Sequence, residues 1–174
     1  IHGHIRQMAQ KRLEEHGGRC RCIRCREIGR RPSNAVEEDR IYTYRCCGGD
    51  EHFISTVAGD ALIGFARLRF PGRVFRPELD GAALVRELHV YGSMVPLGEE
   101  GKGSDRQHRS YGKQLLARAE EKAREAGYDK VAIAGGFSAN KRLRELIVEK
   151  IGDRQFFAPT MDLCGDNGAM IAAQ

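Results

Sequence analysis

The sequence has no apolar run that approaches the ~20 residues needed to span a bilayer. Its first six residues, Ile1 to Arg6, are polar and lack the apolar centre of a signal peptide. Internal repeats and low-complexity tracts are absent as well. These absences predict a cytoplasmic protein with no membrane partner. The initial Ile in place of Met suggests a piece of a longer chain.

Acidic residues are scarce near the amino end. Residues 1–31 contain nine Lys or Arg and three Glu, so they carry +6, and the rest of the chain carries −1 of the total +5. A basic block of this kind is typical of a nucleic-acid-binding surface, with a solvated basic helix as the alternative. The 174 residues suffice for one domain, or one domain and a small appendage, and 41% hydrophobic residues permit a buried core.

Hydrophobic periodicity and turn residues predict an α+β fold. We expect helices at 5–16, 114–126, 141–150 and, with small residues, after Cys164; strands at 41–45, 52–57, 61–70, 83–91, 130–134 and 155–158; and a linker at 32–40. Ser138 or Asn140 is the expected cap of the helix at 141–150. The order of these elements, a strand meander followed by helix and strand, is typical of this class, with helices that flank a sheet.

The clearest signal for a site is the passage from the strand at 83–91, through the polar loop 96–106, into a helix entered through residues 107–112. A helix start presents free amide N–H groups and the positive end of its dipole, which suits a pyrophosphate. Alternation along the strand places Leu84, Arg86, Leu88 and Val90 on one face and Val85, Glu87, His89 and Tyr91 on the other. The second face thus carries two candidate bases, Glu87 and His89. Either side chain could act as a base near an amine or water, and a hydrogen-bonded or salt-bridged strand residue is the alternative.

Cysteine is concentrated in one short loop. Cys20, Cys22 and Cys25 place three thiols within six residues, which suits three of the four ligands of a tetrahedral Zn²⁺. Free thiols are the alternative, and a disulfide does not suit a cytoplasmic protein. The candidates for a fourth ligand are His16, Cys46, Cys47 and His52. Cys164 fits a small buried hydrophobic position.

Several stretches resemble the Elongator catalytic subunit family over residues of about 5–133. They are R-C-R-C-I-R-C-R-E, L-I-G-F-A-R-L-R, V-R-E-L-H-V-Y-G-S-M-V-P and Q-H-R-S-Y-G-K-Q-L-L. The resemblance implies a small zinc-binding segment followed by a GNAT-like acetyltransferase sheet. It also implies modification of the tRNA wobble uridine with acetyl-CoA. S-adenosylmethionine and the iron–sulfur cluster belong to a radical-SAM domain of the full-length family, which this chain lacks and which is therefore an expected partner.

The resemblance also implies roles for individual residues. Cys20, Cys22 and Cys25 correspond to zinc ligands. Glu87, a candidate base from the strand alternation, is the expected catalytic residue. Acetyl-CoA would be lined by Glu87, Leu88, His89 and Val90 and, at its pyrophosphate, by Gln107, His108, Arg109, Ser110, Tyr111, Gly112 and Lys113. In GNAT proteins that turn reads Q-x-x-G-x-G or Q-x-x-G-x-A. Here Ser110 replaces the first glycine, and its side chain is expected to reduce affinity where backbone approaches phosphate.

From about residue 132 the resemblance changes. A-G-G-F-S-A-N-K-R-L-R-E-L and F-F-A-P-T-M-D-L-C-G-D-N-G-A-M-I-A resemble the carboxyl end of the tRNA threonylcarbamoyladenosine synthase family, which has an actin-like ATPase fold. Asp166 occupies the position of a metal-binding aspartate, but the two histidines that complete that site have no counterpart, so we expect no metal there. The two similarities suggest a chimera joined at the strand of residues 130–134.

The expected organisation is a basic zinc-binding segment at 1–34, an incomplete acetyl-CoA-binding GNAT-like domain at 35–134 and a tail at 135–174. The expected function is the acetyltransferase portion of an Elongator-type tRNA acetyltransferase. The alternatives are a catalytically dead tRNA-binding module and a fragment of the tRNA threonylcarbamoyladenosine synthase.

Overall fold

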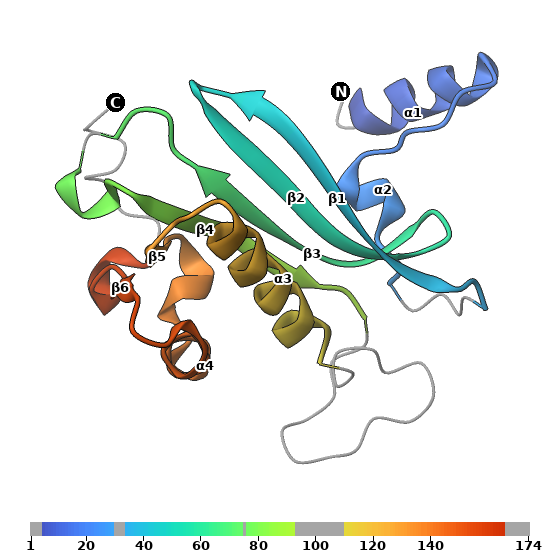
Figure 1. The fold of residues 1–174 in the computed structure, drawn as a ribbon. Helices are drawn as coiled ribbons and strands as arrows, with labels where there is room; N and C mark the ends of the chain where they lie inside the picture. The colour runs from blue at the N-terminus through green and yellow to red at the C-terminus, as the bar shows by residue number, and fades with distance from the viewer. Residues whose placement is uncertain (1–4, 30–33, 75, 93–109, 166–174) are drawn as a thin grey trace.

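The structure is a computed structural model that describes residues 5–29, 34–74, 76–92 and 110–165 (Figure 1). Its α-helices are α1 (Ile5–Glu15), α2 (Ile23–Arg26), α3 (Tyr111–Glu125) and α4 (Lys141–Ile151). Its strands are β1 (Glu37–Cys46), β2 (Gly49–Ala58), β3 (Ala61–Phe70), β4 (Ala82–Val90), β5 (Lys130–Ile133) and β6 (Gln155–Phe157). Short 3₁₀ turns lie at Pro77–Leu79, Gly136–Ala139 and Met161–Leu163. The predicted helix after Cys164 lies largely outside the described residues.

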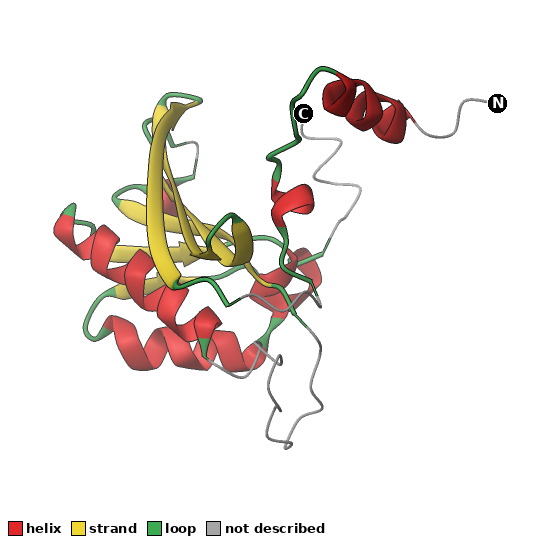
Figure 2. Cartoon of the chain, turned by 90° about the vertical axis from the view of Figure 1, so that its right-hand side faces the viewer, coloured by secondary structure: helices red, strands yellow, loops and turns green. Residues whose placement is uncertain are grey.

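The strands form one six-stranded sheet in the order β1-β2-β3-β4-β5-β6. The strands β1 to β4 pair antiparallel with one another, whereas β5 pairs in parallel with both β4 and β6. The parallel half requires crossovers, and α3 and α4 supply them (Figures 1 and 2). The predicted α+β class is therefore confirmed. None of the helices within the described ranges is both long and apolar enough to cross a membrane.

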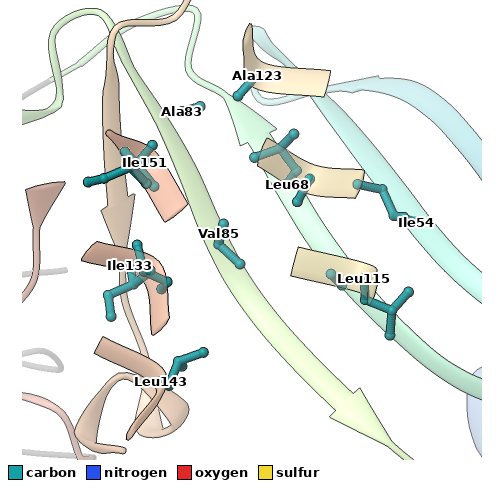
Figure 3. Close-up of a cluster of buried hydrophobic side chains, with 13 residues drawn as sticks. Ile54, Leu68, Ala83, Val85, Leu115, Ala123, Ile133, Leu143 and Ile151 are labelled. Atoms are coloured by element: carbon teal, nitrogen blue, oxygen red, sulfur yellow. The ribbon is translucent and has the colours of Figure 1, made fainter. Parts of the chain in front are cut away.

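Helices α3 and α4 pack on the same face of the sheet and close the main core (Figure 3). Buried residues recur at helical spacing in both: Leu115, Ala119 and Ala123 in α3, and Leu143, Ile147 and Ile151 in α4. The strands contribute Ile54, Ala66, Leu68, Ala83, Val85, Val131 and Ile133 to the same cluster. Burying each large aliphatic side chain contributes about 1.5–3 kcal/mol. The segment after β5 is thus part of this core.

The amide of Leu143 donates to Asn140 Oδ1 at 3.1 Å, so Asn140 is the cap of α4. Of the two predicted caps, Asn140 is confirmed and Ser138 is wrong. Ser138 is instead fully buried, and its hydroxyl contacts Gly135 O and the buried thiol of Cys164.

The predicted linker at 32–40 is wrong in its second half, because Glu37–Arg40 begins β1 and pairs with Ser55–Ala58. These residues are charged and exposed, as suits the outer edge of a sheet. A charged edge strand lacks the apolar alternation from which strands are predicted, which explains the error.

The predicted alternation of β4 is wrong at its start. Arg67 pairs with Glu87 but the next residue of β3, Leu68, pairs with Val85, so Arg86 is an extra residue in a β-bulge. Val85 consequently lies on the helix-covered face with the core, whereas Glu87 faces Arg67 on the other side of the sheet. One inserted residue therefore reverses which side chains share a face.

Candidate functional site

One edge of β4 opens beyond Val85. Among the described residues, the parallel pairing with β5 runs from Ala82 opposite Lys130 to Val85 opposite Ile133 and is not continued. On its other edge, β4 stays paired with β3 as far as Val90. A strand edge without a neighbouring strand can hydrogen-bond an extended ligand along its length.

The start of α3 lies beside the end of β4. A Cβ added to Gly112 would lie 3.8 Å from Val90 Cγ2. Tyr111 anchors this junction, since it is 3% exposed, packs with Ile28 and Ile63, and donates from its hydroxyl to Glu37 Oε2 at 2.6 Å. The first-turn amides of α3 are thereby held near the open edge of β4.

Ser110 precedes α3 in a left-handed conformation, with φ of 60° and no capping hydrogen bond from its side chain. Glycine adopts this conformation without strain, and any other residue costs about 1–2 kcal/mol. The GNAT turn motif Q-x-x-G-x-G has glycine at this position, and the positive φ explains that preference. Gln107, His108 and Arg109, which are predicted to complete the turn, lie outside the described residues, as does Asp166.

Glu87 and His89 lie on the sheet face opposite α3 and α4. Glu87 Oε2 is 3.7 Å from Arg67 Nε, and the Arg67 guanidinium lies 5.9 Å from the centre of the Phe53 ring. The His89 ring stacks on Phe65 with centroids 5.2 Å apart. The two predicted bases thus share a face, as expected, and Glu87 has the ion-pair partner that the alternative interpretation required.

Sequence reasoning missed a buried carboxylate next to this face. Glu51 is 1% exposed, and both Arg69 Nη1 and Arg86 Nη1 donate to it at 3.2 Å. Two guanidinium groups compensate for the removal of the carboxylate from water. Arg86 is the extra residue of the β4 bulge, so Glu51 ties the bulge to β2 and β3. No sequence signal marks Glu51, because its partners come from two later strands.

The three thiols predicted as zinc ligands come together. The sulfur atoms of Cys20, Cys22 and Cys25 lie within 4.8 Å of one another, and Arg6 Nη2 lies 3.3 Å from Cys25 Sγ. A hydrogen bond from the Cys25 backbone N–H, supported by the neighbouring thiols, lowers the pKa of Cys22 to about 7. Two thiolates on one tetrahedral zinc are about 3.8 Å apart, so this cluster fits three positions of such a site.

None of the four predicted candidates joins the cluster as a fourth ligand in the described structure. Cys46 and Cys47 lie at the β1–β2 turn, whereas the cysteine loop contacts the β2–β3 turn through Asp60 (Figure 1). The two turns lie at opposite ends of β2, whose ten residues span about 30 Å. His52 is buried in the core face, and the His16 ring contacts Arg12 O at the end of α1.

A mixed sheet that opens between β4 and β5 in front of a helix start, preceded by a thiol-rich loop, defines a GNAT-like acetyltransferase fold with a segment able to hold zinc. The chain is 38% identical over 157 residues to tRNA uridine(34) acetyltransferase of Methanocaldococcus jannaschii, covering 84% of this chain and 29% of that protein. It is 38% identical over 163 residues to Elongator complex protein 3 of Danio rerio, covering 87% and 29%.

A solved structure agrees with these similarities. Elp3 of Methanocaldococcus infernus, with residues 1–46 deleted, matches with a TM-score of 0.69 and 36% identity, over 80% of this chain and 35% of that one. The chain is therefore a relative of the tRNA uridine(34) acetyltransferase and Elongator complex protein 3 family, as the sequence resemblance predicted. It spans about a third of the length of these relatives.

The resemblance of the tail is also confirmed. The sequence profile of the family TsaD, tRNA N6-adenosine threonylcarbamoyltransferase, matches residues 107–173, which begins earlier than the predicted 132. The Elongator similarity in turn covers 84% of the chain, more than the predicted range of 5–133. The two similarities therefore overlap in sequence.

Proposed function

We propose that this chain binds acetyl-CoA and takes part in the acetyl-CoA-dependent modification of the tRNA wobble uridine. The observation that carries the proposal is the position of the α3 start beside the open edge of β4. Amide N–H groups and the helix dipole offer an anion site there, and the strand edge offers partners to the amide-containing arm of the coenzyme. The names and identities of the relatives support the same function.

In this proposal the pyrophosphate lies against residues 107–113, including Lys113, and the pantetheine arm follows Glu87 to Val90. Acetyl-CoA supplies the activated acetyl group when bound. Glu87 is the proposed base, and the guanidinium of Arg67 lies beside its carboxylate. Arg86 and Glu51 hold the β4 bulge, which directs Glu87 to the sheet face opposite α3 and α4.

Zinc is the proposed metal of Cys20, Cys22 and Cys25, where it would fix the loop that carries α2 against the sheet.

The proposed partners are tRNA and a radical-SAM domain on another part of the protein or another chain. The proposed location is the cytoplasm, where the tRNA is found. We also retain as a proposal the division into segments 1–34, 35–134 and 135–174, although α4 and β6 of the last segment share the sheet and core.

Isothermal titration of the chain with acetyl-CoA tests the coenzyme site. Lys113→Glu places a negative charge in the first turn of α3, where it would repel the pyrophosphate. We expect affinity at least about tenfold lower, since two like charges ~4 Å apart near a protein surface repel each other by ~1–4 kcal/mol. Lys122→Glu makes the same change later in α3 and should leave affinity within about twofold. Absence of binding heat at millimolar acetyl-CoA, or equal effects of the two variants, would contradict the proposal.

A tRNA-binding module without catalysis is the second candidate, because helix α1 has no buried residue and belongs to the segment that carries +6. This candidate predicts tRNA binding that weakens steeply with salt and survives Glu87→Ala. Binding that does not change with salt would count against it. A fragment of the threonylcarbamoyl-transfer enzyme is supported by the match at 107–173 alone and predicts ATP binding.

A further inference from the structure

The turn between β1 and β2 carries two adjacent thiols that the proposed function does not use. Cys46 Sγ and Cys47 Sγ lie 3.6 Å apart, and both cysteines are free. The distance is far longer than the ~2.05 Å of a disulfide bond. It is close to the ~3.8 Å between two thiolates that share one ion. Cys46 is half-buried and Cys47 is exposed, so a small reagent can reach the pair.

The backbone holds the thiol pair in place. Cys47 and Gly48 both have positive φ, 45° and 72°, which is the conformation of a tight two-residue hairpin turn. The guanidinium of Arg69 donates to the carbonyl oxygens of Cys46 and Cys47 at 3.1 and 3.0 Å. Arg69 is itself held by the buried carboxylate of Glu51 at 3.2 Å. The turn is thus pinned at its carbonyls, and little ordering remains to be done when a ligand joins the two sulfurs.

The number of available ligands decides which metal or metalloid the thiol pair can hold. Zinc needs about four ligands, and in the described ranges no further Cys, His, Asp or Glu forms a metal-holding group with Cys46 and Cys47. A trivalent arsenic that bears one organic group needs only two thiolates. We propose that Cys46 and Cys47 form a dithiol site for monosubstituted trivalent arsenicals.

The reaction balances without an oxidant. An arsenical R–As(OH)₂ forms two As–S bonds and loses its two hydroxyl groups, which leave as two water molecules with the two thiol protons. Arsenic remains trivalent throughout. The product is a ring closed through the peptide bond between Cys46 and Cys47. A second attachment within one molecule strengthens binding by a factor on the order of 10²–10⁴ over a single thiol.

The test uses the full chain, phenylarsine oxide and intact-protein mass spectrometry with peptide mapping. Since Cys20, Cys22 and Cys25 also offer thiols, the C20S/C22S/C25S variant isolates the turn. We expect one adduct in that variant, mapped to the peptide with Cys46 and Cys47. It should withstand excess 2-mercaptoethanol and be removed by 2,3-dimercaptopropanol. The C46S/C47S variant should lose one adduct relative to the unmodified chain, which provides a second measurement if the triple variant does not fold.

Single substitutions show whether both thiols take part. Cys46→Ser and Cys47→Ser should each weaken retention in 2-mercaptoethanol at least about a hundredfold. Adducts confined to Cys20, Cys22 and Cys25 would overturn the proposal. So would an adduct at the turn that a monothiol removes as readily from the unmodified chain as from either single variant. The acetyl-CoA titration is independent, so failure of one proposal leaves the other unaffected.

Discussion

At the scale of single residues, Ser110 combines a strained backbone with a place in the proposed coenzyme site. Its φ of 60° is favourable for glycine and costs other residues about 1–2 kcal/mol. Ser110→Gly should therefore raise the free energy of unfolding by about 0.5–1 kcal/mol, after allowance for the more flexible unfolded chain. Denaturant unfolding measures this. Ser110→Ala keeps the strain and should give no gain.

Ser110→Gly should also tighten acetyl-CoA binding, because it removes a side chain where the backbone is proposed to approach the pyrophosphate. Titration of both variants separates the two effects. Equal affinities for Ser110→Gly and Ser110→Ala would place the pyrophosphate elsewhere.

His52 is a second residue with a measurable consequence. It is 5% exposed, and its Nδ1 lies 2.8 Å from Thr43 Oγ1. Burial, with a smaller contribution from Lys122, lowers the pKa of His52 below 6.5, and the opposing effects of Asp50 and Glu51 do not reverse the shift. The unfolded chain therefore binds more protons than the folded chain as pH falls through about 6.5.

Stability should consequently decrease on acidification, and part of the decrease should belong to His52. In His52→Gln, the loss of unfolding free energy between about pH 7 and about pH 5 should be smaller than in the unmodified chain. Chemical denaturation at the two pH values measures the difference. Identical losses in both proteins would show that His52 does not titrate differently on folding.

At the scale of elements, Glu51 links three strands through Arg69 and Arg86. Glu51→Gln leaves two guanidinium groups without their counter-charge, and Arg86 is 42% exposed, so water compensates in part. We expect a loss of about 2 kcal/mol of unfolding free energy, since breaking a fully buried pair costs about 3–5 kcal/mol.

Asp50→Asn is the matched control for Glu51→Gln. The substitution removes the Asp50 carboxylate, which forms an ion pair with Arg45. The side chains of Arg45 and Asp50 are 76% and 46% exposed. An exposed pair of this kind contributes at most about 1 kcal/mol. Equal losses in the two variants would show that Glu51 does not anchor the β4 bulge.

At the scale of the whole molecule, two similarities meet in one sheet. The relatives named for tRNA uridine acetylation cover most of the chain, and the TsaD profile covers residues 107–173. The structure joins both regions in one core, where Leu143, Ile147 and Ile151 of α4 pack with β3, β4 and β5. Helical spacing of apolar residues suffices for this packing, whichever family supplies the helix.

Much of the fold and part of the site could be predicted from the sequence. Apolar periodicity and glycine turns predicted β3 and α4 closely, because local spacing decides which residues can share a buried face. The spacing of Cys20, Cys22 and Cys25 predicted their cluster for the same reason, since neighbours in a tight loop stay close in space.

Tertiary structure alone decided the remainder, where partners are distant in sequence. The β4 bulge follows from pairing with β3, and it reversed the predicted faces of Val85 and Arg86. The pairing of Glu51 with arginines from two later strands and the separation of Cys46 and Cys47 from the other thiols depend on sheet register. Local sequence does not predict strand register, because register is set by contacts across the whole sheet.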